Sequence, residues 1–166
     1  MELRELSITD GIDIFEMLQR IGSAEYGFHN DVNGMTFPQY KTWLIKQHAW
    51  SIGEELPAGY VKQWTYWLID DDGKPVGYGK LREKATKESM KFGGNIGYAI
   101  DSKKRGLGYG KQLFKMLLQK SKLLGIQEIF STVEKYNYPS KKIHEVSGFK
   151  LINEDDARWY LYFRNY

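Results

Sequence analysis

The sequence contains no cysteine, and it is short of other features that mark whole classes of protein. Without cysteine there are no disulfides and no thiolate metal sites. The three histidines do not stand at a carboxylate–histidine spacing typical of metal ligands, so we predict no metal. The longest apolar run is far below the ~20 residues that cross a bilayer, and the start lacks the basic-then-apolar pattern of a secretory signal. These shortages predict a cytoplasmic protein that binds no membrane.

What the chain does contain is typical of one globular domain. It has 166 residues, of which 42% are hydrophobic and 27% charged, enough for a substantial core. The net charge is +3, but it is unevenly spread: six lysines and one arginine lie between Lys103 and Lys122, with no acidic residue. This segment is either a solvated helix face or a local anion site. Because the positive charge is confined to it, we expect no nucleic-acid partner.

Apolar periodicity and turn residues predict an α/β (α+β) fold. Asp70–Lys74 forms a hairpin turn, so the core contains an antiparallel hairpin. The helix over 107–124 is a crossover, and the strands on either side of it can run parallel. The predicted helices run from a cap at Thr9 or Asp10 to Leu18, and over Phe37–Ala49, Leu107–Leu124 and Pro139–Ser147. The predicted strands are Glu2–Leu6, Gln63–Ile69, Pro75–Glu83, Asn95–Ile100, Ile126–Val133, Phe149–Ile152 and Trp159–Phe163.

The most informative segment is NIGYAIDSKKRGLGYG, from Asn95 to Gly110. An apolar strand leads into a basic, glycine-rich turn that opens a helix, and such a turn directs backbone N–H groups at an anion. A Walker loop fails here, because Gln112 replaces the metal-binding hydroxyl and Arg105 replaces the first glycine. A dinucleotide fingerprint is weakened because Lys111 stands where the third glycine belongs.

A third pattern, Arg/Gln-x-x-Gly-x-Gly/Ala, is complete from Arg105 to Gly110. With it the chain resembles the GCN5-related N-acetyltransferase (GNAT) superfamily. The resemblance extends to the strand Asn95–Ile100, the Asn-x-x-Ser element at Asn137–Ser140 and the Gly148-Phe149 pair, and it covers about residues 60–153. The segments QWTYWLID and FPQYKTWL further resemble a bacterial branch of predicted acetyltransferases.

The resemblance implies a GNAT fold, in which a central mixed, mostly antiparallel sheet splays into a V and is flanked by about four helices. It implies acetyl-CoA as co-substrate, with residues 1–62 on the substrate side, 63–153 as the cofactor-binding core and 154–166 as a terminal strand. Ser140 would lie near the phosphates or cap the last helix. The implied cofactor-binding residues are Tyr98, Ala99 and Ile100 along the pantetheine arm, Arg105, Gly106, Leu107, Gly108, Tyr109, Gly110 and Lys111 at the phosphates, and Asn137 and Ser140.

Family members transfer the acetyl group by direct attack of an amine on the thioester. The family's acid is a tyrosine five residues before the phenylalanine of the Gly-Phe pair, and here that position is His144. The family's glutamate base corresponds to Asn95, so Glu83, at the end of the preceding strand, is the replacement by position. We therefore predict His144 as acid and Glu83 as base. The alternatives are an ordinary helix residue for His144 and a solvated strand end for Glu83.

In the family the acceptor is selected by the N-terminal helices and the loops between them. Here these loops are Gly22–Thr36 and Ser51–Lys62. The first contains Glu25, Tyr26, Phe28, His29, Asn30 and Asp31, and carboxylates beside aromatic rings suit a cationic amine on a small molecule or peptide. Of these we predict Tyr26, Phe28, His29 and Asp31 as substrate-binding residues. The alternative is an irregular loop whose aromatic residues fill the core.

The predicted function is thus an acetyl-CoA-dependent N-acetyltransferase. One alternative is a non-catalytic module that binds or senses acyl-CoA, which the missing tyrosine and glutamate favour. Another is an acyltransferase that uses aminoacyl-tRNA, which the lack of a broad basic face argues against. The aromatic surplus and the terminal strand pair permit a homodimer.

Overall fold

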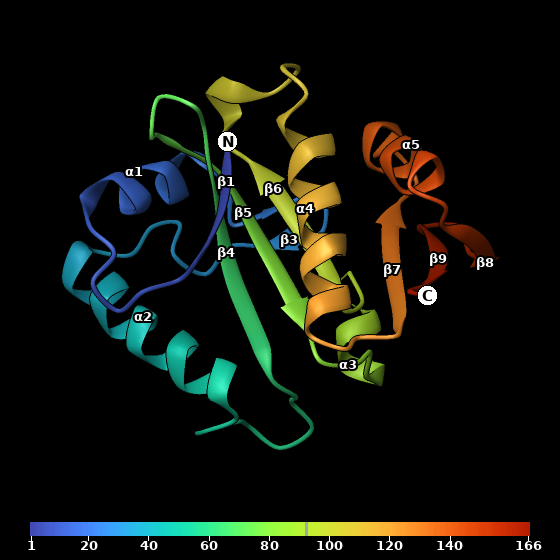
Figure 1. Ribbon diagram of the computed structural model, residues 1–166, viewed down its shortest axis with the longest axis horizontal. Coiled ribbons are helices and arrows are strands. Elements are labelled where there is room, and N and C mark those ends of the chain that lie inside the picture. Colours follow the sequence, from blue (N-terminus) through green and yellow to red (C-terminus); the bar gives the residue numbers. More distant parts are fainter. Residues whose placement is uncertain (92) are drawn as a thin grey trace.

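The computed structural model describes residues 1–91 and 93–166, and its strands form two larger sheets and one short hairpin (Figure 1). All the strand pairings in these sheets are antiparallel. In order across the first sheet the strands are β1 (Glu2–Glu5), β4 (Gln63–Ile69), β5 (Pro75–Arg82) and β6 (Ile96–Ile100). In order across the second they are β7 (Glu128–Glu134), β9 (Arg158–Arg164) and β8 (Lys150–Glu154), and the hairpin joins β2 (Ala24–Glu25) to β3 (Phe28–His29).

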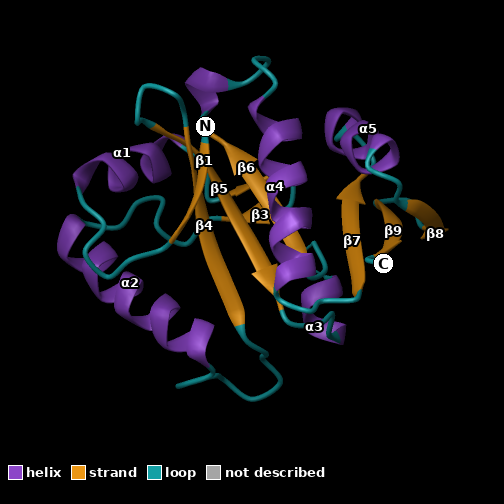
Figure 2. Cartoon of the chain, viewed as in Figure 1, coloured by secondary structure: helices purple, strands orange, loops and turns teal. Residues whose placement is uncertain are grey.

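Helices cover both faces of the first sheet (Figure 2). Helices α1 (Ile12–Arg20) and α2 (Phe37–Ile52) pack on one face, α4 (Tyr109–Leu123) packs on the other, and α5 (Tyr138–Val146) lies beside the second sheet. A short helix, α3 (Lys87–Met90), precedes β6. None of the helices in the described ranges combines the length and apolar character needed to span a bilayer.

Each face of the first sheet has its own hydrophobic core. Trp67 and Tyr78 are fully buried against α1 and α2. On the opposite face, α4 approaches β5 closely because β5 carries glycine there: a Cβ added to Gly79 would lie 2.9 Å from a methyl of Leu117. This close contact fixes the position of α4, and with it the loop that precedes the helix.

The two sheets are joined where the residues just before β6 lie against β7. The Asn95 amide donates to the Phe130 carbonyl at 2.9 Å, and the Thr132 amide donates to the Gly93 carbonyl at 3.3 Å. The buried side chain of Asn95 adds two bonds, donating from Nδ2 to the Glu128 carbonyl at 3.0 Å and accepting at Oδ1 from the Phe130 amide at 2.7 Å. Asn95 therefore holds the two sheets together at this end.

Between Gly93 and Asn95 the backbone must approach β7 closely. Gly94 has φ +83°, and a Cβ at this position would lie 2.0 Å from the Phe130 carbonyl oxygen. Only glycine fits such a contact. Beyond this junction β6 and β7 are edge strands of separate sheets, so each turns a row of backbone groups toward the space between them.

The predicted fold class is confirmed, whereas several element boundaries are not. Asp10 does not cap α1: Gly11 is the N-cap, and Asp10 is buried, where it accepts a hydrogen bond from Trp67 Nε1 at 2.6 Å. Helix α4 begins at Tyr109 instead of Leu107, because Gly108 takes up φ +84° as its N-cap. Neither the β2–β3 hairpin nor α3 was predicted, because both are too short to show periodicity.

The Asn95 side chain yields a test of the sheet junction. Asn95→Ala removes a hydrogen bond to the Glu128 carbonyl and another from the Phe130 amide, both partly buried, so we expect the free energy of unfolding to fall by about 1–3 kcal/mol. Urea denaturation measures the change. Asn153→Ala, at an exposed position on β8, is the control and should stay within ~0.5 kcal/mol of wild type. Equal stabilities of the two variants would contradict the role given to Asn95.

Candidate active site between β6 and β7

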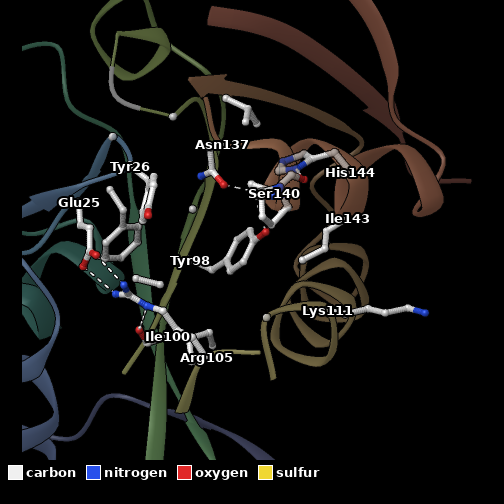
Figure 3. A pocket seen from close by; sticks show the side chains of 18 of the residues that line it. Glu25, Tyr26, Tyr98, Ile100, Arg105, Lys111, Asn137, Ser140, Ile143 and His144 are labelled. Atoms are coloured by element: carbon white, nitrogen blue, oxygen red, sulfur yellow. Dashed lines mark hydrogen bonds and ion pairs between the residues drawn. The ribbon is translucent and has the colours of Figure 1, made fainter. Parts of the chain in front are cut away.

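A cavity of about 660 Å³ occupies the space where β6 and β7 diverge (Figure 3). One wall is β6, from Ile96 to Ile100, and the opposite wall is formed by residues 131–133 of β7 and the start of α5. The loop before α4 closes one end, and the β2–β3 hairpin lies over the cavity from the side of α1 and α2. The cavity is therefore a direct consequence of the sheet junction described above.

The loop before α4 presents backbone donors without acceptors. The Lys104 amide bonds to the Asp101 carbonyl at 2.8 Å, and the Gln112 amide bonds to the Gly108 carbonyl at 3.2 Å. Between these two, the amides of residues 105 to 111 make no hydrogen bond to any described residue. Several of these residues line the cavity, together with the basic Lys104 and Lys111. Orphan amides at a helix N-terminus, with positive charge beside them, form a site for an anion.

Arg105 is held by the β2–β3 hairpin. Its guanidinium donates to both carboxylate oxygens of Glu25, at 2.5 and 2.6 Å, and its Nε donates to the Ile100 carbonyl at 3.2 Å. The hydrogen bonds from Arg105, and to a smaller extent its charge, lower the pKa of Glu25, while the same pair raises the pKa of Arg105. Both side chains are about one-third exposed, so water screens the pair in part.

The tip of this hairpin reaches the opposite wall of the cavity. Tyr26 and Gly27 have φ +51° and +79°, the left-handed conformations of a tight two-residue turn. The Tyr26 ring lies 6.0 Å from the Tyr136 ring, and a Cβ on Gly27 would lie 3.1 Å from the Glu134 carboxylate. The hairpin thus spans the cavity from Arg105 on one side to the end of β7 on the other.

His144 is buried at the α5 wall, where both ring nitrogens are hydrogen-bonded. Nδ1 lies 2.8 Å from the Ser140 carbonyl, which only accepts, so Nδ1 carries a proton. Burial lowers the pKa of His144 to about 4, so the ring is neutral at pH 7, and Nε2 accepts from the Ser131 hydroxyl at 2.8 Å. The Phe114 and Phe149 rings enclose it at 4.3 and 4.9 Å. In this state His144 carries no imidazolium proton.

The first turn of α5 places two further predicted residues at the cavity. Asn137 is the helix N-cap and accepts from the Ser140 amide at 3.2 Å, so the cap expected of Ser140 is supplied by Asn137 instead. Ser140 turns to Tyr98 on the opposite wall: the two hydroxyls are 3.1 Å apart. Burial raises the pKa of Tyr98 to about 12, which keeps its phenol protonated.

A family model described as "Acetyltransferase (GNAT) family" matches residues 30–149, which include the anion loop and both walls of the cavity. The chain belongs to the GNAT family. This confirms the resemblance drawn from the sequence, and it associates the chain with acetyl transfer in general. A comparison with curated proteins gives no match.

Solved GNAT structures share the fold over nearly the whole chain. Campylobacter jejuni N-acetyltransferase PseH, solved with acetyl coenzyme A, aligns with a TM-score of 0.65 and 13% identity over 99% of each chain. Mutant forms of the spermidine/spermine N-acetyltransferase SpeG from Vibrio cholerae align with a TM-score of 0.66 and 17% identity, over 98% of this chain and 93% of that one. The ribosomal-protein-S5-alanine acetyltransferase from Vibrio fischeri aligns with a TM-score of 0.67 and 15% identity, over 98% of this chain and 92% of that one.

The structure brings most of the predicted residues of this GNAT chain to one cavity. They come from four parts of the chain: the hairpin, β6, the loop with the start of α4, and α5. The predicted residues that line the cavity are Tyr26, Phe28, Tyr98, Ala99, Ile100, Arg105, Gly106, Gly108, Tyr109, Gly110, Lys111, Asn137, Ser140 and His144.

Four predicted residues are not among the described residues that line the cavity. Glu83 is exposed one residue beyond β5, where its amide bonds to the Lys62 carbonyl, so its position gives no support to a role as base. The Leu107 side chain is 65% exposed. His29 and Asp31 are exposed as well, although the His29 carbonyl accepts from Lys80 Nζ at 2.5 Å.

Two further residues that line the cavity are Glu25, which lies in the loop Gly22–Thr36 but is not among the predicted site residues, and Ser131, which was not predicted. Glu25 is paired with Arg105, and Ser131 with His144. Asn95, at the position of the family's base, has its side chain committed to the sheet junction. The hairpin turn consists of Tyr26 and Gly27. Glycine is typical of such a turn, but tyrosine is not, so the sequence indicates the hairpin only weakly.

The buried state of His144 predicts how stability depends on pH. Because folding lowers this pKa from 6.5 to about 4, the unfolded chain binds more protons within that range, and stability falls as the pH drops through it. Between pH 7.5 and 5 we expect His144 to account for a loss of about 2 kcal/mol. Urea denaturation of wild type and His144→Gln at both pH values measures it, and the variant should lack this part of the loss. Equal losses in both proteins would contradict a buried neutral ring.

Proposed function

We propose that the chain is an N-acetyltransferase that moves the acetyl group of acetyl-CoA to a primary amine of a small molecule or peptide by direct attack. The observation that carries the proposal is the run of amides from 105 to 111 without partners, which opens into a cavity between two edge strands. Diphosphate oxygens match those amides, and a pantetheine arm carries amides of its own that match a strand edge.

The residues present suit acetyl-CoA in three respects. Gly106 and Gly108 have φ +76° and +84°, and a Cβ on either would point into open space, so nothing crowds a phosphate at the backbone. Lys104 and Lys111 supply positive charge. Tyr98, Ala99 and Ile100 offer the β6 edge to the pantetheine arm. When bound, acetyl-CoA supplies the activated acetyl group as a thioester.

We assign the substrate side to residues 1–62, the cofactor side to 63–153 and a terminal strand to 154–166. The hairpin of the N-terminal segment covers the cavity with Tyr26 and Phe28, so an acceptor amine would enter beside it. The acceptors named for two similar structures are polyamines and a ribosomal protein, which is consistent with an amine on a small molecule or peptide here.

A non-catalytic acyl-CoA-binding module remains the second candidate. Two observations favour it: Asn95 is committed to structural bonds, and His144 is neutral at pH 7 with both nitrogens occupied. A role for His144 as acid stays a prediction. Turnover separates the two functions. Release of CoA from acetyl-CoA that depends on an added amine supports the enzyme, whereas tight CoA binding without release by any amine in a panel supports the module.

Gly108→Ala tests the anion loop. The added methyl group stands where a phosphate would approach, so we expect CoA to bind at least ~10-fold more weakly by titration calorimetry. The left-handed φ of +84° makes a side chain at 108 unfavourable by about 1–2 kcal/mol, but the new Cβ meets no atom within 4 Å, so the fold should survive. Gly125→Ala is the matched control: Gly125 has φ +73°, open space around its Cβ and a place at the other end of α4. Equal CoA affinities of the two variants would overturn the proposed function.

A further inference from the structure

Glu25 is the one carboxylate among the described residues that line the cavity. The charged side chains that share this lining, Lys104, Arg105 and Lys111, are all positive. Among the described lining residues, Glu25 is therefore the one that offers a cationic ligand a complementary charge. In the structure the Glu25 carboxylate is already paired, because both of its oxygens accept hydrogen bonds from the Arg105 guanidinium.

Arg105 begins the row of amides without partners, and its side chain lies at the same end of the cavity as the loop (Figure 3). An arginine fork that fits a carboxylate with two hydrogen bonds fits phosphate oxygens equally well. A diphosphate on the loop would thus compete with Glu25 for the Arg105 guanidinium. Because the pair is about one-third exposed, the exchange meets only a modest barrier from the lost ion pair.

We propose that the Glu25 carboxylate binds the cationic group of the acceptor. Arg105 occupies this carboxylate until the diphosphate of the cofactor binds the Arg105 guanidinium instead. This inference rests on the proposed function. Cofactor binding then creates the acceptor site, so the two ligands bind in order, with the cofactor first. If bound cofactor raises the affinity for the acceptor by some factor, thermodynamic linkage requires bound acceptor to raise the affinity for the cofactor by the same factor.

The same geometry limits the class of acceptor. A nitrogen that Glu25 holds as an ammonium has no lone pair with which to attack a thioester. The group that Glu25 binds is therefore a second cationic nitrogen, and the acceptor carries at least two basic nitrogens. The Tyr26 and Tyr136 rings, 6.0 Å apart beside Glu25, add aromatic faces that favour an alkylammonium chain.

Calorimetry with unacylated CoA tests the proposal without turnover. The probes are butane-1,4-diamine and butylamine, each titrated into wild type with and without saturating CoA. We expect the diamine to bind at least ~5-fold more tightly when CoA is present, and butylamine to show no such gain. In Glu25→Gln the diamine should lose this gain, while CoA itself should bind ~2- to 5-fold more tightly because its competitor for Arg105 is gone. Glu154→Gln, which breaks the Lys135–Glu154 ion pair at an exposed position, is the matched control and should change neither affinity.

The outcomes separate this inference from the proposed function. A wild type that binds CoA, but binds the diamine equally with and without it, overturns the inference and leaves the proposed function standing. The same holds if Glu25→Gln keeps the gain, or if it binds CoA no more tightly than wild type. A wild type that does not bind CoA overturns both.

Discussion

The hydrogen bonds between residues 93–95 and β7 are the constraint on which the rest of this structure depends. They join one end of the first sheet to the second sheet, and a close approach at Gly94 that no side chain permits makes this possible. From there β6 and β7 diverge as edge strands, so the cavity between them has peptide groups in its walls. The position where the family has a glutamate is occupied by Asn95, which joins the sheets with both ends of its amide. Both polar atoms of the Asn95 side chain are therefore committed to structure.

Charge is distributed unevenly around the cavity, and the distribution follows from chain topology. The basic side chains come from the loop and the start of α4, where the orphan amides already favour an anion. The one carboxylate among the described lining residues comes from the N-terminal hairpin, which borders the cavity with Glu25 and Tyr26 (Figure 3). The Glu25–Arg105 pair connects the two halves of the chain that were expected to serve acceptor and cofactor. This one ion pair therefore connects the proposed acceptor site with the proposed cofactor site.

The fold class and the left-handed glycine-rich loop follow from the sequence because both depend on local signals. Gly106 and Gly108 have left-handed backbone conformations, which glycine adopts most readily. The spacing of the glycines in RGLGYG therefore indicates where the chain turns. The Glu25–Arg105 pair was beyond such reasoning, since its partners are 80 residues apart and the hairpin that carries Glu25 has only two residues in each strand. The state of His144 was likewise unpredictable, because it follows from burial beside rings from distant parts of the chain: Tyr98 in β6, Phe114 in α4 and Phe149 just before β8. The prediction for Glu83 depends on its position after a strand, and Glu83 is not among the described residues that line the cavity.

The account's central claim is that the amides of residues 105 to 111 hold a diphosphate. Amide hydrogen exchange of the protein with and without CoA tests it most directly, because those amides have no partner in the described chain and should exchange fast when free. The account predicts that CoA slows exchange at residues 105–111 and along β6 from Tyr98 to Ile100, with little change in β8. Unchanged exchange across the loop at saturating CoA, or protection confined to another surface, would contradict it.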